Sequence, residues 1–164
     1  MGEGPVRTMS LLLIIRLRGR TGIPPEVEKT LELLRLTRKY HAVIYPGSES
    51  IEGMLDVVKD WVTWGEVSSE VLKDLITYRG RLVGGKTLTQ EDVKKVFNLS
   101  SIDELVNALI DCKVLWHKAS GVEPIFRLRP PKGGFKRSIR RPYKSHGELG
   151  YRGSEINELA RRMI

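Results

Sequence analysis

The chain is short of cysteine and of side-chain amides. Cys112 is the only cysteine among 164 residues, which excludes an internal disulfide framework and an all-cysteine metal site. A lone thiol suits a reducing cytosol. Asparagine and glutamine together occur four times, whereas 29% of the residues are charged, and this bias is typical of heat-adapted proteins.

Long hydrophobic runs are missing as well. The run at 11–15 has five apolar residues and is followed at once by Arg16. A membrane-spanning helix needs about 20, and a signal peptide needs a longer apolar region with a small-residue cleavage site. The run is better interpreted as a buried strand. We therefore expect a cytoplasmic chain of one domain's length that contacts no membrane.

Acidic residues are nearly absent from one stretch, residues 127–152, which is called the strap below. It contains nine lysines and arginines and a single acid, Glu148, so the strap carries the whole net charge of +8. The charges of the other 138 residues sum to zero. Clustered cations gain affinity for a polyanion by releasing its condensed counterions. The strap therefore predicts a polyanionic partner and not merely a solubilising tail.

The first 67 residues predict a β-α-β-α-β order. Short apolar stretches alternate with amphipathic ones, and they indicate strands at 11–17, 42–45 and 61–67. Pro24 and Pro25 open the first helix, and basic residues are expected in its last turn, where they complement the helix dipole: Arg35, Arg38 and Lys39. A small sheet covered by two helices follows from this order.

After residue 67 the pattern becomes helical and then irregular. Thr89 with Asp92, and Ser101 with Glu104, have the spacing of capping boxes ahead of two helices. A last strand is expected at 125–128. Prolines and glycines in the strap are expected to prevent regular structure, and a terminal amphipathic helix is expected to dock its far end on the core.

The segment GRLVGGKT at 80–87 matches the phosphate-loop pattern letter by letter. That chemistry needs a strand before the loop and a helix that starts at its lysine. Here the preceding residues, 71–76, have helical spacing, and the next helix is capped later, at Thr89. A basic loop between helices is favoured over nucleotide hydrolysis.

Residues 90–110 imitate a helix-turn-helix. A recognition helix needs Arg, Lys, Asn or Gln to approach phosphates and base edges. The second helix instead has Asp103 and Glu104, and no cation stands between Ser101 and Cys112. A DNA-binding regulator is therefore the weaker alternative.

No catalytic or metal-binding pattern stands out. His41, His117 and His146 lie in different segments without ligand spacing, and no G-x-S-x-G motif occurs. Cys112 falls on an apolar helical stripe, as a buried structural thiol does. We expect no enzyme activity, no metal or cofactor, and no small-molecule substrate.

The strap interleaves its cations with aromatic residues, among them Phe135, Tyr143 and Tyr151. Such segments suit irregular RNA, in which splayed bases stack on rings and phosphates meet guanidinium groups. Glycines and prolines let an extended chain follow a folded RNA surface. We therefore expect an RNA partner, contacted mostly through phosphates and shape.

An ordered series of motifs is similar to one known family. It comprises GI at 22–23, LTRK at 36–39, HAVI at 41–44, SIEGML at 50–55 and WGEV at 64–67, after an opening strand with Arg16 and Arg18. The continuation comprises TYRG at 77–80, LT at 88–89, FRL at 126–128, PPKGG at 130–134 and the ending at 150–164. Residues 9–164 thereby resemble the large-subunit ribosomal protein family called L30 in bacteria and archaea and L7 in eukaryotes, in its longer archaeal and eukaryotic form.

The resemblance implies an α+β fold. It has a three-stranded antiparallel sheet with the first strand central and two helices behind it, distantly ferredoxin-like, plus a helical insertion and an extended basic segment ending in a short helix. It also implies a non-catalytic component of the large ribosomal subunit that binds 23S rRNA near 5S rRNA, beside neighbouring ribosomal proteins.

Four segments are expected on this basis: a disordered N-terminus at 1–8, an rRNA-binding core at 9–67, a helical extension at 68–122, and the basic extended segment with the terminal helix at 123–164. The residues expected to contact RNA are the cations of the core, the inter-helix loop and the strap: Arg16, Arg18, Arg20, Arg35, Arg38, Lys39, Arg79, Arg81, Lys86, Arg127, Arg129, Lys132, Lys136, Arg137, Arg140, Arg141, Lys144 and Arg152.

Overall fold

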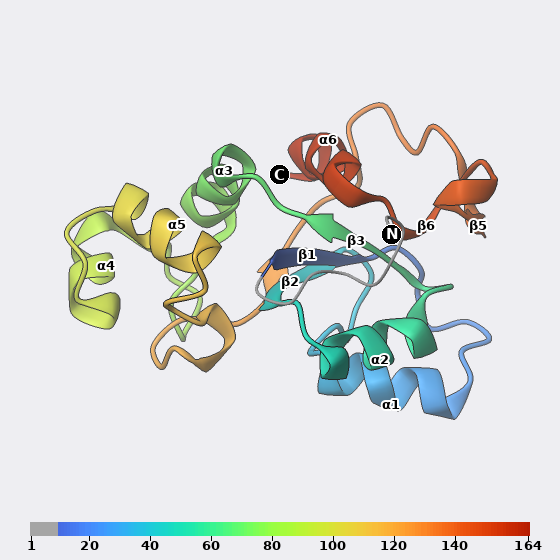
Figure 1. Cartoon of the computed structure of the whole chain (residues 1–164), viewed down its shortest axis with the longest axis horizontal. Helices are drawn as coiled ribbons and strands as arrows, with labels where there is room; N and C mark the ends of the chain where they lie inside the picture. Colours follow the sequence, from blue (N-terminus) through green and yellow to red (C-terminus); the bar gives the residue numbers. More distant parts are fainter. Residues whose placement is uncertain (1–9) are drawn as a thin grey trace.

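The computed structural model describes residues 10–164. The expectation of disorder at 1–8 therefore lies outside the described residues. Figure 1 shows a central sheet with helices above and below it, and a second group of helices beside it. The α+β class expected from the sequence is confirmed.

A six-stranded mixed sheet runs through the centre in the order β4-β2-β1-β3-β6-β5. Its strands are β1 (Leu11–Arg16), β2 (His41–Pro46), β3 (Val62–Glu66), β4 (Phe126–Arg127), β5 (Ser138–Pro142) and β6 (Gly147–Tyr151). β1 pairs antiparallel with β2 and β3, and β4 pairs antiparallel with β2. β6 pairs parallel with both β3 and β5.

Helices cover both faces of the sheet, which is why the 11–15 run is continuously apolar. Leu12 and Ile14 pack with α1 (Pro25–Leu33) and α2 (Glu49–Val58) on one face. Leu13 and Ile15 pack on the other face with residues of α3 (Ser69–Arg79), α5 (Ile102–Ile110) and α6 (Ile156–Met163). β1 is thus buried along its whole length.

The predicted three-stranded sheet is right for its central part and wrong in its extent. β2-β1-β3 has the first strand central, as expected. The strap, however, adds strands instead of staying irregular. Its prolines at 130–131 and glycines at 133–134 fall in the connection between β4 and β5, whereas β6 contains no proline. An unpaired edge of β3 would leave backbone donors and acceptors without partners, and β6 supplies them.

The end of α1 also differs from the prediction. The helix ends at Leu33, and its last turn holds no basic residue. Arg35 adopts a left-handed conformation with φ of 67°. The amide of Leu36 donates to the carbonyl of Leu31 at 2.8 Å, which closes the helix end. Arg38 and Lys39 therefore lie in the turn before β2 and do not complement the helix dipole.

The helices beside the sheet follow their predicted caps closely. The Thr89 and Asp92 capping box is present at the start of α4 (Gln90–Phe97). Ser101 caps α5 by accepting from the amide of Glu104, while the Glu104 carboxylate contacts Ser100 instead of Ser101. α6 docks its apolar face on the core, as expected. Among residues 10–164, no helix is long and apolar enough to cross a membrane.

Candidate nucleic-acid interface

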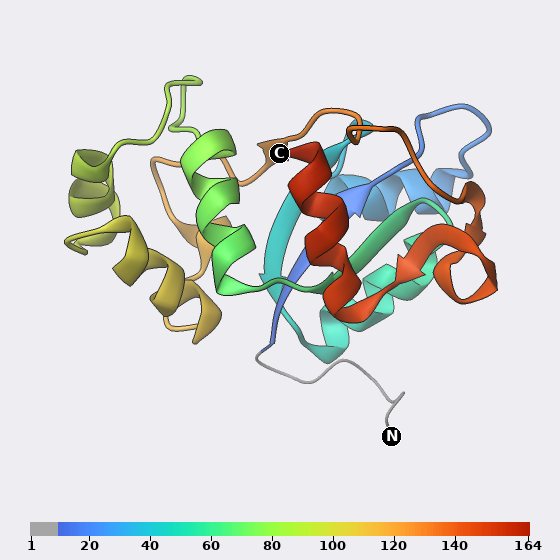
Figure 2. The ribbon, with the colours of Figure 1, turned by 90° about the horizontal axis from the view of Figure 1, so that it is seen from above.

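Antiparallel pairing brings the end of β1 and the starts of β2 and β3 to the same end of the sheet. β1 ends there at Arg16, opposite Val62 at the start of β3, and Ile15 pairs with Ala42 near the start of β2. In Figure 2 the loop at 17–24 and the connection at 128–137 both lie at this end of the strands, and Figure 1 shows them on opposite faces of the sheet. The loop 17–24, the turn 36–40 and the segment 127–135 are together called the basic edge.

Tyr40 holds the parts of the basic edge together. Its amide donates to the carbonyl of Arg16 at 2.7 Å, and its carbonyl accepts from the amide of Leu128 at 3.1 Å. Its ring lies 6.3 Å from the ring of Phe135, centroid to centroid. Residues that are far apart in the sequence therefore form one continuous surface.

The predicted contact residues of the core separate into exposed and engaged side chains. Arg20, Arg38 and Lys39 are exposed on the basic edge. The Arg18 guanidinium lies 4.3 Å from the centroid of the Trp61 ring and donates to the carbonyl of Asp60 at 3.2 Å. Arg35, although exposed, donates to the carbonyl of His117 at 3.1 Å, away from the strand ends.

Arg16 is buried, with only 2% of its surface exposed. Its guanidinium donates to the carbonyls of Leu36 and Arg18, both at 2.8 Å. Burial, followed by the charge of Arg20, lowers the pKa of Arg16 from its ordinary value. Since its donors hold the protein's own backbone, Arg16 leaves the set of residues that can meet RNA at the surface.

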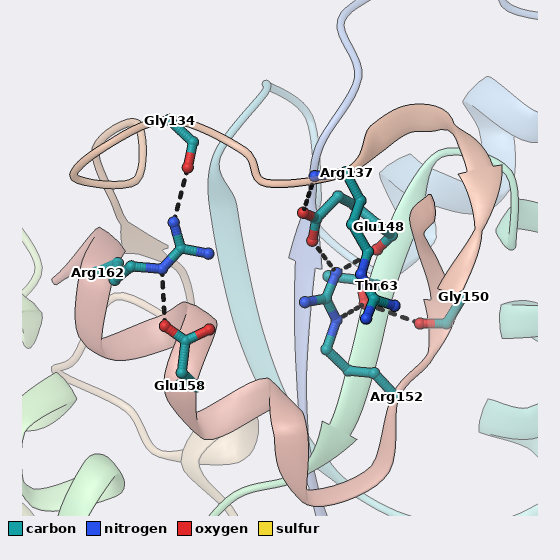
Figure 3. A network of polar contacts seen from close by, with 8 residues as sticks. All are labelled: Thr63, Gly134, Arg137, Glu148, Gly150, Arg152, Glu158 and Arg162. Atoms are coloured by element: carbon teal, nitrogen blue, oxygen red, sulfur yellow. Dashed lines mark hydrogen bonds and ion pairs between the residues drawn. The ribbon is translucent and has the colours of Figure 1, made fainter. Parts of the chain in front are cut away.

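Arg152 is the second predicted contact that the structure buries (Figure 3). Its Nη2 donates to Oε1 of Glu148 at 2.8 Å, and its Nε donates to Oγ1 of Thr63 at 2.8 Å. Thr63 in turn donates to the carbonyl of Gly150 at 2.8 Å, and the other Glu148 oxygen accepts from the amide of Arg137 at 2.9 Å. Arg152 therefore attaches the strap to β3. Like Arg16, it is not among the residues that can contact RNA at the surface.

Two further contacts fix the strap. Arg162 on α6 donates to the carbonyl of Gly134 at 2.7 Å and to the Glu158 carboxylate at 2.9 Å (Figure 3). Gly65 on β3 lies against the backbone of Gly153, where any side chain would overlap it. The strap is thus anchored at both of its ends.

The remaining strap cations point to solvent. Lys136, Arg140, Arg141 and Lys144 are exposed, and their side chains make no hydrogen bond or ion pair within residues 10–164. Arg137 is also exposed and lies 4.8 Å from the centroid of the Tyr143 ring. Glu148, the only acid of the strap, is already paired with Arg152. These five charges are consequently uncompensated by carboxylates of the described chain.

A basic cavity of about 500 Å³ lies where α3 and α6 meet the strap. Arg79, Arg129 and Lys132 line it, as do Arg161, which sequence reasoning missed, and also Asp74 and the C-terminal Ile164. The only signal for Arg161 was its place in the last turn of the terminal helix. Arg79 donates to the terminal carbonyl of Ile164 at 2.8 Å and to the carbonyl of Arg127 at 3.3 Å. Burial, and then the charges of Arg129 and Arg81, lower its pKa.

The three remaining predicted cations, Arg127, Arg81 and Lys86, do not line this cavity. Arg127 pairs with Glu123 at 3.0 Å, which reduces its charge for a partner. Arg81 donates to the carbonyls of Tyr78 and Gly80, and Lys86 is exposed in the loop that follows. Most of the cations predicted to contact RNA therefore lie on the basic edge, on the exposed strap or at the cavity. Arg16 and Arg152 are buried, and Arg35 lies apart from the others.

Comparisons with known proteins show which family the chain belongs to. The family model described as ribosomal protein L30p/L7e matches residues 12–62. Large ribosomal subunit protein uL30 of Staphylothermus marinus is 50% identical over 159 residues, which cover 94% of this chain and 98% of the relative. The chain belongs to this family. The uL30 protein of Thermofilum pendens is 51% identical over 157 residues, covering 95% of this chain and 100% of the relative.

Membership in the uL30 family, which is structural and non-enzymatic, agrees with the geometry of the two rival motifs. The helix α3 stands before the glycine-rich loop where a phosphate loop needs a strand, and the next helix starts only at Gln90. In α5 the acids Asp103 and Glu104 are exposed, and Asp103 pairs with Lys73 at 2.9 Å. No group of His, Cys, Asp and Glu side chains in the described part of the chain has the arrangement of a metal site.

Proposed function

We propose that this uL30 family member is a structural constituent of the large ribosomal subunit that binds 23S rRNA near 5S rRNA through the basic edge and the exposed cations of the strap. The observation that carries the proposal is that cations from three separate segments lie at one end of the sheet, while Glu123 and Glu148 are already paired with Arg127 and Arg152. Phosphates of a folded RNA neutralise such a surface and release its counterions.

The contacts are expected to be with phosphates and with RNA shape more than with base edges. Arg20, Arg38 and Lys39 extend from loops and turns that can follow an irregular backbone. The cavity with Arg79, Arg129 and Lys132 offers a further place for a phosphate. Neighbouring ribosomal proteins are expected at the helical extension, because α5 exposes acids and no cation.

Salt dependence of binding tests the proposal. Purified protein is titrated with large-subunit rRNA and with duplex DNA of equal length, each over a series of KCl concentrations. Six to nine phosphate contacts predict a slope of log K against log salt of roughly −0.7 to −0.9 per contact for the rRNA. Co-sedimentation with large subunits through a high-salt gradient should persist.

The alternatives predict different results in the same assays. A helix-turn-helix regulator would prefer one duplex sequence and release rRNA, and that outcome would overturn the proposal. A phosphate-loop enzyme would bind ATP or GTP with Mg²⁺ and lose this binding with Lys86→Ala. We expect nucleotide binding at background in both the unchanged protein and this variant.

A further inference from the structure

A cavity of about 320 Å³ lies beside the basic edge, between β3, β6 and the end of β5. Trp64, Leu149 and Tyr151 form apolar walls, and Lys59 and Lys144 also line it. The rings of Trp64 and Tyr151 are 6.3 Å apart and inclined by 49°. Three aromatic residues, Trp64, Tyr143 and Tyr151, therefore line this one cavity.

The walls of this cavity include ring surface that folding has left partly uncovered. Tyr151 is 39% exposed although its hydroxyl is fixed by donating to the Glu66 carboxylate. Trp64 is 9% exposed, and its indole N–H has no hydrogen-bond partner within residues 10–164. The partly exposed Tyr151 ring beside Trp64 therefore favours a flat ligand that can stack on it.

The surroundings of the cavity indicate the charge of its ligand. Arg18, which belongs to the basic edge, donates to the carbonyl of Asp60, another residue of the cavity wall. Lys144, another lining residue, is exposed and follows Arg140 and Arg141 in the strap, whereas Asp60 brings one carboxylate to the wall. A ligand here lies between two groups of cations. This suits an unstacked nucleotide, whose base would enter the cavity while its flanking phosphates stay outside, beside the cations.

We propose that this cavity receives a single unstacked base of the bound RNA, with its flanking phosphates on the side of Lys144 and of Arg18. This inference rests on the proposed function, since it supposes that RNA follows the basic edge. It adds a base contact to an interface otherwise made with phosphates. An apolar side chain of a neighbouring protein is the competing occupant, and it fits the cationic surroundings less well.

Two hexanucleotides of equal charge test the inference, hexaadenylate and an abasic hexaribonucleotide. Stacking of one base predicts that the unchanged protein binds hexaadenylate about tenfold more tightly than the abasic strand. Tyr151→Leu should abolish this difference by weakening the binding of hexaadenylate about tenfold. Tyr151→Phe, the matched control, keeps the ring and should keep the difference.

The indole N–H resonances of the unchanged protein give a readout that needs no variant. The Trp64 resonance should shift with hexaadenylate and stay in place with the abasic strand. Trp116 is the internal control, because its indole N–H donates to the carbonyl of Glu123 at 3.1 Å inside the core. An unmoved Trp64 resonance at saturating hexaadenylate would overturn the inference.

The remaining outcomes separate the two proposals. If both hexanucleotides bind equally and with the same salt slope, the base cavity is wrong while RNA binding by the basic edge stands. If neither they nor large-subunit rRNA bind with a salt slope, the proposed function itself fails. If N-acetylleucinamide shifts the Trp64 resonance where adenosine monophosphate does not, the cavity accepts a protein side chain and the inference is overturned.

Discussion

The two halves of the candidate interface carry similar charge but hold it differently. In the core half, Arg18 is stacked on Trp61 and Lys39 lies 5.2 Å from the centroid of the Tyr40 ring. In residues 136–144, called the distal strap, Arg137 lies 4.8 Å from the centroid of the Tyr143 ring, whereas Arg140, Arg141 and Lys144 have no such partner among the described residues. A charge that is already positioned loses little entropy on binding, whereas a solvated one contributes mainly by counterion release. The core half therefore fixes orientation, and the distal strap supplies most of the salt-dependent affinity.

The comparison depends first on whether the strap is held in place without RNA. Arg152→Met would leave Glu148 buried without its partner, and loss of one member of a buried pair costs about 3–5 kcal/mol. We expect this loss in the free energy of unfolding, measured by urea denaturation in the absence of RNA. The largest predicted effect is thus on stability, although the substitution removes a residue of the basic strap.

Arg141→Met is the matched control, because it removes the same side chain from an exposed position of the strap. Its effect on unfolding should stay within about 0.5 kcal/mol. Equal stability of the two variants would show that the network around Glu148 is not formed in the free protein. The strap would then become ordered only on RNA.

The sequence placed the charge of the strap correctly but not its structure. The charge count identified residues 127–152, and the count holds. The charge count could not tell the buried Arg152 from the exposed Arg141. Burial of Arg152 depends on its contact with Thr63, which is far away in the chain. Thr63 becomes a neighbour of Arg152 only when β6 pairs with β3. Long-range strand pairing of this kind leaves no periodic pattern in a five-residue strand.

The second prediction concerns the distal strap itself. Changing all five of its exposed cations to Gln should lower affinity for large-subunit rRNA roughly 10²–10³-fold at 0.2 M salt and reduce the steepness of the salt slope by about 4. The variant has five substitutions, at Lys136, Arg137, Arg140, Arg141 and Lys144. Binding is measured by filter retention at KCl concentrations between about 0.05 and 0.4 M, a range wide enough to define the slope.

A control with the same net charge separates location from total charge. It carries five Gln substitutions at exposed lysines outside the interface, at Lys29, Lys94, Lys95, Lys113 and Lys118. The control should bind rRNA nearly as the unchanged protein does. Equal losses in the two variants would contradict a localised contact. Deletion of the whole strap is the poorer experiment, because it removes β4 and β6 and uncovers both edges of the central strands.

The third prediction addresses the core half, where fewer charges are solvated. Arg20, Arg38 and Lys39 changed together to Gln should lower rRNA affinity about 10–10²-fold and reduce the steepness of the salt slope by about 2 to 3. Unfolding should change little, since all three side chains are exposed. A slope change as large as that of the distal strap would mean that the two halves contribute alike.

The core was more predictable than the strap for a physical reason. The strands and helices before residue 67 are specified by local apolar spacing and by proline at the start of α1, and the structure has them in the predicted order. Arg16, however, looked like a surface cation at a strand end. Its burial results from Leu36, which turns back to the core after α1 and presents a carbonyl to the guanidinium.

The smallest effect expected is the pH response of His41, which lies between the two halves. His41 is buried, pairs with Arg127 across β2 and β4, and has no partner for its Nδ1 within residues 10–164. Burial lowers its pKa below the ordinary value, followed by the charges of Arg127, Arg38 and Arg16. The unfolded chain therefore binds a proton more readily than the folded one, and stability should be complete above about pH 6.5 and fall as pH decreases through the folded pKa.

His41→Phe should weaken this fall between about pH 7 and pH 5, measured as urea midpoints at fixed salt. The pKa of His117 is also lowered, by burial and then by Lys118 and Arg35, so part of the response should remain in the variant. Bound rRNA should reduce the contribution of His41, because phosphates along the basic edge offset the arginine charges that oppose its protonation. A response of His41 that is the same with and without rRNA would place the phosphates away from the junction of the two halves.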